Sequence, residues 1–366
     1  MIRVLFESHH LYYLPHFTPI MTVMQERARY SIAASLPLGV PSGEREAFAR
    51  AVENLDVEYL TAGSESDRLK RLHDTPFDVI IVGNVGRLPK IAGEHTLAVM
   101  VYHGIGLKQS YYRDISPRVD IRAVESEERF EELRALGFRN SILTGFTKLD
   151  PLAQPAGREL EQYRAKLNLD PDVPTMLYAP TFYPSSLERL APSIQELARD
   201  MNVILKLHNF SWFQKRYARH HRLARSLAES HAHICLVPPE DYDILPCYRL
   251  ADVLLSDLSS TLFEFLATGK PVIKADTVKL RLKHRLFQRR IQRRLDARRE
   301  QQIDFAYPVN APEDLVGSVH RILVNPDELA GARQSAARRY LYRLDGQASH
   351  RLVDAIEKNL GERIQP

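Results

Sequence analysis

The sequence ADVLLSDLSSTLFEFLATGKPVI occupies residues 251–273 and decides the fold. An apolar run ends at Ser256, hydroxyl residues then open a helical pattern, and Gly269 with Pro271 closes that pattern before a second apolar run begins. Apolar runs without polar alternation are typical of parallel strands whose two faces are both covered. The segment therefore predicts a strand, a helix and a second strand of one parallel sheet.

The same alternation of short apolar runs and helical patterns extends through most of the chain. In the first half the runs predict strands at 3–6, 30–33, 57–60, 78–82, 97–102, 121–124 and 141–143, with a helix at 126–137. In the second half they predict strands at 175–179, 203–207, 233–237, 252–256 and 272–275. Helices are predicted there at 193–200, 214–230, 241–251, 260–268 and 312–323, followed by a helical tail at 328–360.

A linker separates the two series. Residues 151–157 read PLAQPAG, which is rich in proline and small residues, and the alternation restarts after them. A chain of 366 residues suits two α/β domains. We therefore predict two Rossmann-like, doubly wound parallel sheets, at 1–150 and 158–330, and expect the helices of 331–366 to pack back on the first domain.

The composition excludes several classes of protein. Hydrophobic residues make up 44% and charged residues 26%, so disorder is not expected. No apolar run reaches the roughly 18 residues of a membrane span. The start, MIRVLF, breaks into ESHH and lacks a signal-peptide pattern, so we interpret it as the first strand. The two cysteines, Cys235 and Cys247, form no disulfide framework, which fits a reducing, cytoplasmic compartment.

Ligands of doubly wound sheets bind beyond the carboxyl ends of the strands, so the residues that follow strands are the candidates. The strand at 97–102 runs into His103-Gly104-Ile105-Gly106. Glycines such as Gly104 and Gly106 let backbone amides approach a phosphate, and His103 could take a proton from a hydroxyl. A structural turn with a solvated histidine explains the pattern equally well.

Two further strand ends carry polar residues. Lys206 and His208 are two residues apart, so on a strand they would share one face, where two potential cations are costly unless they meet an anion. Thr181 follows a Pro turn after the strand at 175–179, a pattern that a plain turn explains better. We predict phosphate binding by the Lys-x-His pair.

The quoted segment carries the most specific candidates. Ser259, Ser260 and Thr261 follow Asp257 at the start of a helix, where hydroxyls, amides and the helix dipole favour an anion. Glu264 lies one turn further along and could accept hydrogen bonds from ribose hydroxyls. The alternative is an ordinary helix cap with a solvated glutamate.

Together these segments resemble the CDP-glycerol glycerophosphotransferase family, the teichoic-acid primase and polymerase group. The family's HGTPLK, YAPT and RxHP segments correspond here to HGIGLK at 103–108, YAPT at 178–181 and KLHN at 206–209. Its Gly-x-Pro-Arg/Lys-x-Asp segment corresponds to GFTKLD at 145–150. Its TDYSS and FDF segments correspond to SDLSS at 256–260 and FEF at 263–265. The resemblance covers about residues 97–275.

The resemblance implies a GT-B fold, with an acceptor-side domain and a nucleotide-donor domain facing a cleft, and transfer of glycerol phosphate from CDP-glycerol to a hydroxyl with release of CMP. It implies that His103 is the base, that His208 assists at the diphosphate, and that Ser259 and Ser260 hold it. The remaining expected donor-binding residues are Lys206, Thr181, Asp257, Thr261 and Glu264, beside a phosphate loop at Gly104 and Gly106.

Four departures from the family segments leave the substrate open. Ile105-Gly106, Asn209, Leu258 and Glu264 stand where the family has Thr-Pro, Pro, Tyr and Asp. The alternatives are a related polyol or sugar phosphate as the transferred group, a GT-B sugar-nucleotide glycosyltransferase, an enzyme like the UDP-sugar 2-epimerases, and a non-enzymatic relative that binds a nucleotide or a polyanion.

No metal or other cofactor is expected besides the CDP-linked donor substrate, because cations and amides would stabilise the diphosphate in this scheme. The histidine pairs at 220–221 and 231–233 lack cysteine or acidic partners at zinc-ligand spacing. The loop after the first strand, with His9 and His10, is a weak candidate for contact with the acceptor.

A basic stretch suggests a further partner. Residues 274–299 carry a net charge of +9, against −5 for the rest of the chain. Their apolar residues recur every four or five positions, which predicts an amphipathic helix at 276–299. Such a helix suits an anionic membrane and a lipid-linked or saccharide acceptor, and would place the protein on the cytoplasmic membrane face. The alternative is a helix packed on its domain. Nucleic acid is not expected, because stacking aromatic residues are scarce.

Overall fold

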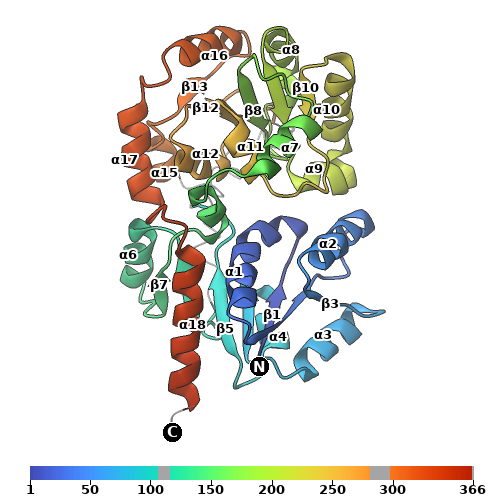
Figure 1. Ribbon diagram of the computed structural model, residues 1–366, viewed down its shortest axis with the longest axis vertical. Coiled ribbons are helices and arrows are strands. Elements are labelled where there is room, and N and C mark those ends of the chain that lie inside the picture. The colour runs from blue at the N-terminus through green and yellow to red at the C-terminus, as the bar shows by residue number, and fades with distance from the viewer. Residues whose placement is uncertain (106–115, 281–296, 365–366) are drawn as a thin grey trace. The chain divides into compact units, whose positions relative to one another are not determined.

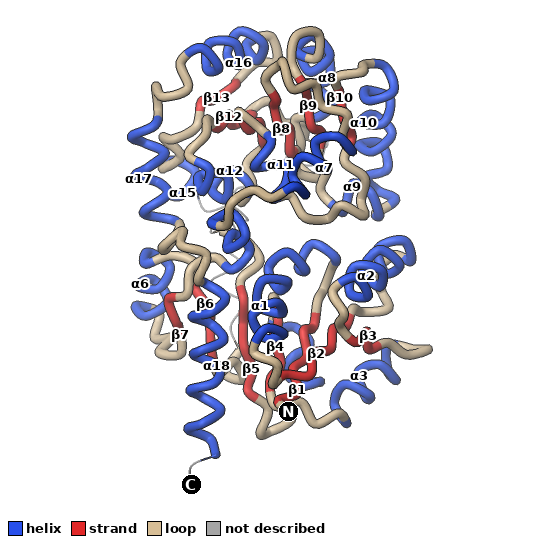
Figure 2. The backbone as a smooth tube through the Cα atoms, viewed as in Figure 1, coloured by secondary structure: helices blue, strands red, loops and turns tan. Residues whose placement is uncertain are grey.

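The computed structural model describes residues 1–105, 116–280 and 297–364 (Figure 1). These residues form two compact units. The first contains residues 1–105, 116–153 and 339–364, and the second contains 154–280 and 297–338. Each unit has one parallel sheet with helices on its faces, as the colouring of strands and helices in Figure 2 makes plain.

The sheet of the first unit has seven strands in the order β3-β2-β1-β4-β5-β6-β7, all parallel. The strands are β1 Ile2–Glu7, β2 Tyr30–Ser35, β3 Glu58–Leu60, β4 Val79–Val82, β5 Leu97–Val101, β6 Ile121–Val124 and β7 Ser141–Leu143. All seven predicted strands are confirmed. The central strands are fully buried, as their uninterrupted apolar runs require when helices cover both faces.

The helices of the first unit are α1 Leu14–Glu26, α2 Ser42–Asn54, α3 Glu65–Asp74, α4 Leu88–Ile91, α6 Glu127–Ala135 and α18 Ala348–Ile364, with the short 3-10 helices η1 Leu11–Tyr13, η2 Val85–Arg87 and η3 Thr147–Ala153. Helix α6 confirms the helix predicted at 126–137, and the other helices of this unit were not predicted individually. In α6 the Ser126 side chain accepts a hydrogen bond from the Arg129 amide, and Gly137 follows the helix with a φ of +91°.

The sheet of the second unit has six parallel strands in the order β10-β9-β8-β11-β12-β13. They are β8 Thr175–Ala179, β9 Asn202–Leu205, β10 Ile234–Leu236, β11 Val253–Ser256, β12 Val272–Ala275 and β13 Tyr307–Val309. The helices are α7 Arg158–Lys166, α8 Leu187–Leu197, α9 Asn209–Phe213, η4 Lys215–Tyr217, α10 Ala218–Ser230, α11 Leu245–Leu250, α12 Thr261–Glu264, η5 Phe265–Thr268, α15 Ala297–Gln301 and α16 Asp314–Val324. Helix α17, Ala330–Tyr340, leads back to the first unit.

Several features differ from the sequence prediction, among them the shift of the helix predicted at 193–200 to α8, 187–197. Strand β13 was not predicted, because it has three residues with Pro308 in the middle, which only an edge strand tolerates. The predicted helix at 260–268 is a single α-helical turn that continues as a 3-10 turn. The predicted tail helix divides into α17 and α18, because Arg343 and Gly346 between them have positive φ angles.

The amphipathic helix predicted at 276–299 does not begin at 276. Residues 276–280 are not helical, and Lys279 pairs with Ser185 through an antiparallel bridge in which the Lys279 amide donates to the Ser185 carbonyl at 2.8 Å. Residues 281–296 lie outside the described part of the chain, so the rest of this helix and its membrane contact stay predictions. Among the described residues, no helix has the length and apolar character needed to cross a membrane.

Candidate active site

The strand order places the candidate residues at the carboxyl edges of the two sheets. In the first unit the chain reverses its direction of winding between β1 and β4, and in the second between β8 and β11. Crevices beyond the carboxyl ends at such switch points are where doubly wound sheets bind ligands. His9 and His10 follow β1 and His103 follows β5, while Thr181, Lys206 with His208, and the 257–261 segment follow β8, β9 and β11.

A backbone carbonyl fixes the orientation of His103. Its Nδ1 atom lies 2.9 Å from the carbonyl oxygen of Gly83, the residue that follows β4. A carbonyl oxygen only accepts hydrogen bonds, so Nδ1 carries a proton, and in the neutral ring the basic lone pair is on Nε2. This tautomer has the polarity that a general base requires. Gly104 is buried beside it, and Gly106 lies outside the described residues.

Tyr13 and Gly83 support the same ring. The rings of Tyr13 and His103 have centroids 4.5 Å apart. A Cβ atom added to Gly83 would lie 2.3 Å from two ring carbons of Tyr13, so only glycine permits this packing. Sequence reasoning missed both residues. The sequence signal that could have indicated Gly83 was its position as a glycine directly after the apolar run of β4, and nothing in the sequence indicated Tyr13.

The substitution Gly83→Ala is expected to lower turnover about a hundredfold, because Tyr13 must move and the hydrogen bond that orients His103 is then distorted. The overpacking should also cost about 1–3 kcal/mol of unfolding free energy. Steady-state kinetics and urea denaturation measure the two effects. Gly39→Ala is the matched control, because a Cβ at that position meets no atom within 4 Å. Full activity of the Gly83 variant would show that the packing is irrelevant to turnover.

The two histidines after β1 lie in different surroundings. His10 Nδ1 is 3.1 Å from the Glu44 carboxylate, and the His10 ring stacks on Tyr12. His9 is largely buried, and burial together with Arg87 lowers its pKa to about 4, so it is neutral near pH 7. Their contact with an acceptor stays a prediction.

His208 and His103 carry their protons on opposite ring nitrogens. It caps α9, and its Nδ1 accepts a hydrogen bond of 3.1 Å from the Phe210 amide. Nδ1 is therefore unprotonated, and the neutral ring carries its proton on Nε2, where it can donate to an anionic oxygen. The Phe182 and Phe210 rings pack against it with centroids at 4.7 and 5.0 Å.

Lys206 and His208 lie just beyond the end of β9 at Leu205. The Lys206 amide still donates to the Tyr178 carbonyl of β8 at 3.0 Å, and His208 has extended backbone angles as the cap of α9. That their side chains share one face stays a prediction. Lys206 is buried, and its ammonium donates to the Asp241 carbonyl at 2.6 Å, which uses one of its three hydrogens.

Ser259, Ser260 and Thr261, the hydroxyl cluster, do not form an ordinary helix cap. Ser260, at the start of α12, already has helical angles, and its side chain makes no capping hydrogen bond. Ser256 donates to the Ala179 carbonyl at 2.7 Å and lies 3.1 Å from the hydroxyl of Ser259. Ser259, Ser260 and Thr261 are partly exposed. The dipole of one helical turn is small, so the hydroxyls and amides would contribute most of any anion binding.

The two candidate carboxylates make internal hydrogen bonds. Asp257 is fully buried and accepts from the amides of Thr181, at 2.8 Å, and Ser186, at 3.1 Å, and also bonds to the Ser186 hydroxyl. It thereby holds the loop that follows β8. Glu264 is also buried and accepts from the Tyr248 hydroxyl at 2.9 Å. Their contact with a donor stays a prediction.

Asp257 is expected to make stability depend on pH. Burial raises its pKa to about 7, although its hydrogen bonds act in the opposite direction. The pKa is about 3.9 in an unfolded chain, so between these values the native state holds a proton that the unfolded state has lost. The unfolding free energy should fall by up to about 1.4 kcal/mol per pH unit as pH rises from about 4 to about 7, and then level off.

Urea denaturation of the wild type and Asp257→Asn across this range measures the contribution of Asp257. The difference between the two proteins should shrink or change sign as pH rises, because the asparagine cannot titrate. Parallel pH dependences would contradict a raised pKa at this position.

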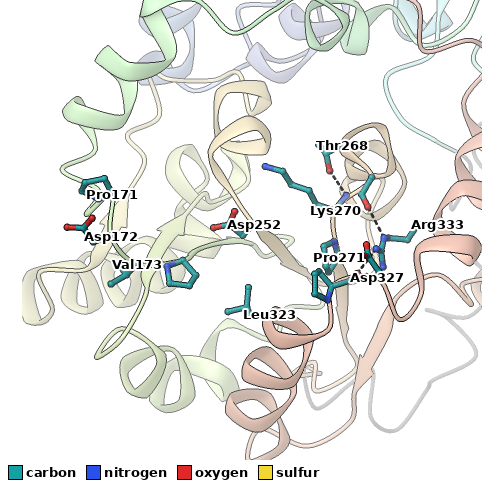
Figure 3. Close-up of a pocket in the computed structure, with 13 residues that line it drawn as sticks. Pro171, Asp172, Val173, Asp252, Thr268, Lys270, Pro271, Leu323, Asp327 and Arg333 are labelled. Carbon is teal, nitrogen blue, oxygen red and sulfur yellow. Dashed lines mark hydrogen bonds between the residues drawn. The ribbon is translucent and has the colours of Figure 1, made fainter.

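A pocket of about 720 Å³ lies at the other edge of the same sheet (Figure 3). Pro174, Asp252 and Pro271, which precede β8, β11 and β12, line it together with Lys270 and Arg333. Lys270 donates to the carbonyls of Arg249 and Ala251, and Arg333 donates to that of Gly269. These charges support the loops at the amino ends of the strands, and none of the candidate site residues lines this pocket.

Residues 122–358 match the family described as CDP-Glycerol:Poly(glycerophosphate) glycerophosphotransferase. The chain belongs to this family. The matched range covers the whole second unit and includes His208 and the hydroxyl cluster, whereas His103 lies before it. The resemblance inferred from the segments at the strand ends is thereby confirmed. No curated protein matches the chain significantly by sequence.

Solved structures show the fold that the glycerophosphotransferase family implies. The wall teichoic acid polymerase TagF, soaked with CDPG, is similar with a TM-score of 0.69 and 16% identity over 100% of this chain and 90% of that one. The UDP-GlcNAc 2-epimerase of Neisseria meningitidis, bound to UDP-GlcNAc, gives a TM-score of 0.64 and 14% identity over 98% and 100%. A putative UDP-N-acetylglucosamine 2-epimerase from Listeria monocytogenes gives 0.63 and 16% over 100% and 98%. The predicted GT-B fold is confirmed.

Proposed function

We propose that the protein transfers glycerol phosphate from CDP-glycerol to an acceptor hydroxyl during synthesis of a cell-surface polymer, and releases CMP. Membership of the glycerophosphotransferase family, over 122–358, is the observation that carries this proposal. The opposite polarity of His103 and His208 supports it, because the transfer needs one group that accepts a proton and another that donates to the leaving phosphate.

The first unit supplies the base. The acceptor oxygen attacks the β-phosphorus of the donor, and a new P–O bond forms as the hydroxyl proton passes to Nε2 of His103. The hydrogen bond from Nδ1 to the Gly83 carbonyl keeps this tautomer and orientation, and stabilises the imidazolium that results.

The second unit binds the donor. The bond between the β-phosphorus and the bridging oxygen breaks, and CMP leaves with the electron pair. His208 donates from Nε2 to the diphosphate, the Lys206 ammonium offsets its charge, and Ser259, Ser260 and Thr261 donate hydrogen bonds to its oxygens. Thr181 lies on the loop that Asp257 holds through hydrogen bonds, and Glu264 is the last residue of α12, the turn that Thr261 begins.

These groups act in place of a divalent cation, so we propose that the transfer needs no metal. The acceptor is lipid-linked or a saccharide. A membrane surface bound through residues 276–299, and contact of His9 and His10 with the acceptor, belong to the same proposal.

The test is CMP release from CDP-glycerol, measured with and without a lipid-linked or saccharide acceptor, in the presence and absence of EDTA. Acceptor-dependent CMP release that EDTA leaves unchanged is the expected result. Release of UMP or UDP from a UDP-sugar, with no CMP from CDP-glycerol, would overturn the proposed donor. Loss of activity in EDTA that magnesium restores would overturn the metal-free scheme.

A further inference from the structure

One exposed side of the second unit is predominantly basic, with Glu229 in the last turn of α10 and Glu188 beside Arg219 as its acidic neighbours. Residues 201–228 include six lysines and arginines and no aspartate or glutamate. Five of the six lie in η4 and α10, namely Lys215, Arg216, Arg219, Arg222 and Arg225, and all five are exposed. Within α10, Arg219, Arg222 and Arg225 are three residues apart, so each lies beside the next on the helix surface, and Arg216 in η4 precedes them.

Most of these charges have no internal counter-ion. Arg219 pairs with Glu188 at 2.9 Å, and its side chain is still 71% exposed. Among the described residues, no carboxylate lies within ion-pair distance of Lys215, Arg222 or Arg225. A solvated helix face in a folded domain usually mixes both signs of charge in similar number, so the excess of positive charge here raises the local concentration of anions.

The basic face begins beside His208. Helix α10 lies next to α9, the helix that His208 caps (Figure 1). The Arg216 guanidinium lies over the Tyr217 ring at 4.8 Å. That ring packs against Phe182 at 5.2 Å, and Phe182 packs against His208 at 4.7 Å. The rings of Tyr217 and Phe182 thus connect the Arg216 guanidinium to His208, the candidate donor to the diphosphate.

We propose that the face formed by Lys215, Arg216, Arg219, Arg222 and Arg225 binds a polyanionic chain with regularly repeated phosphodiesters, the growing product of the reaction. This inference rests on the proposed function, which generates such a chain one phosphodiester at a time. A row of point charges one helical turn apart suits repeated negative charges without requiring a shaped pocket. The face thus acts as an exosite that selects long acceptors over short ones.

The test compares Arg222→Glu/Arg225→Glu with the control Arg158→Glu/Arg199→Glu, whose arginines are exposed on other parts of the second unit. Both variants change the net charge equally. Binding of poly(glycerophosphate) is measured by fluorescence titration without donor, and KM is measured for acceptors with one and with many phosphodiesters. In the α10 variant the Kd and the KM for the long acceptor should rise about tenfold, while the KM for the short acceptor stays unchanged.

Three outcomes would overturn the inference. They are an equal effect on long and short acceptors, an equal effect of the control variant, and a defect confined to vesicles rich in phosphatidylglycerol. The last would assign the face to a membrane. Failure of the proposed function is a separate result, because it appears as absence of CMP release in the wild type, whereas polymer binding is measured without turnover.

Discussion

Replacing His103 by alanine is expected to lower acceptor-dependent CMP release about a thousandfold, because the variant has no group to take the acceptor proton. The donor should still bind, since the second unit holds the residues proposed for it. Rapid-quench measurement of CMP release, together with titration of CDP-glycerol binding, separates the two effects. The expected pattern is a loss of kcat with little change in donor affinity.

Two further variants distinguish the base from the hydrogen bond that orients it. His103→Asn can still donate to the Gly83 carbonyl but has no basic nitrogen, so it should be as inactive as His103→Ala. His320→Ala is the control, because His320 lies in α16 and its Nε2 is 3.0 Å from the carboxylate of Asp200, which precedes β9 at the amino edge of the sheet. It should keep full activity. An active His103→Asn protein would remove His103 from the role of base.

The sequence predicted most of the parallel strands because they are buried on both faces, and that burial demands uninterrupted apolar runs. The run Val79–Val82 is such a case, and each of its residues is buried. Strand β13 was not predicted, because Pro308 argues against a strand. The proline is tolerated there because β13 lies at the edge of the sheet. Most strand ends were predictable for the same reason, since an apolar run stops where the sheet reaches its edge, but β9 ends at Leu205, two residues before its predicted end.

The residue types of the candidate site were predictable from the sequence. Which ring nitrogen of each histidine carries the proton was not. The sequence shows His103 and His208 after strands, but their proton positions depend on the carbonyl of Gly83, which follows another strand twenty residues earlier, and on the Phe210 amide. The inward direction of Asp257 depends on Thr181 and Ser186 from a different strand-to-helix loop. Such contacts arise from strand order, which the hydrophobic pattern of one strand does not encode.

Substitution of His208 is expected to have the second large effect on the rate of transfer. Its side chain has two separable functions, since Nδ1 accepts from the Phe210 amide and the proposed donor is the hydrogen on Nε2. His208→Ala removes both and is expected to lower kcat about a hundredfold or more, the cost of one lost donor to a developing charge. The loss of the cap should reduce the unfolding free energy by about 1 kcal/mol.

Replacing His208 by asparagine or by glutamine separates these two functions experimentally. His208→Asn can cap α9, because its side-chain oxygen reaches the Phe210 amide, but it places no donor at the Nε2 position. His208→Gln extends its amide to about that position and caps poorly. If the donor matters, the glutamine variant should keep activity within about tenfold of the wild type, and the asparagine variant should be as slow as alanine while unfolding like the wild type. The reverse order, with asparagine active and glutamine inactive, would make His208 a positioning residue for the turn into α9, and the diphosphate would then depend on Lys206 and the hydroxyl cluster.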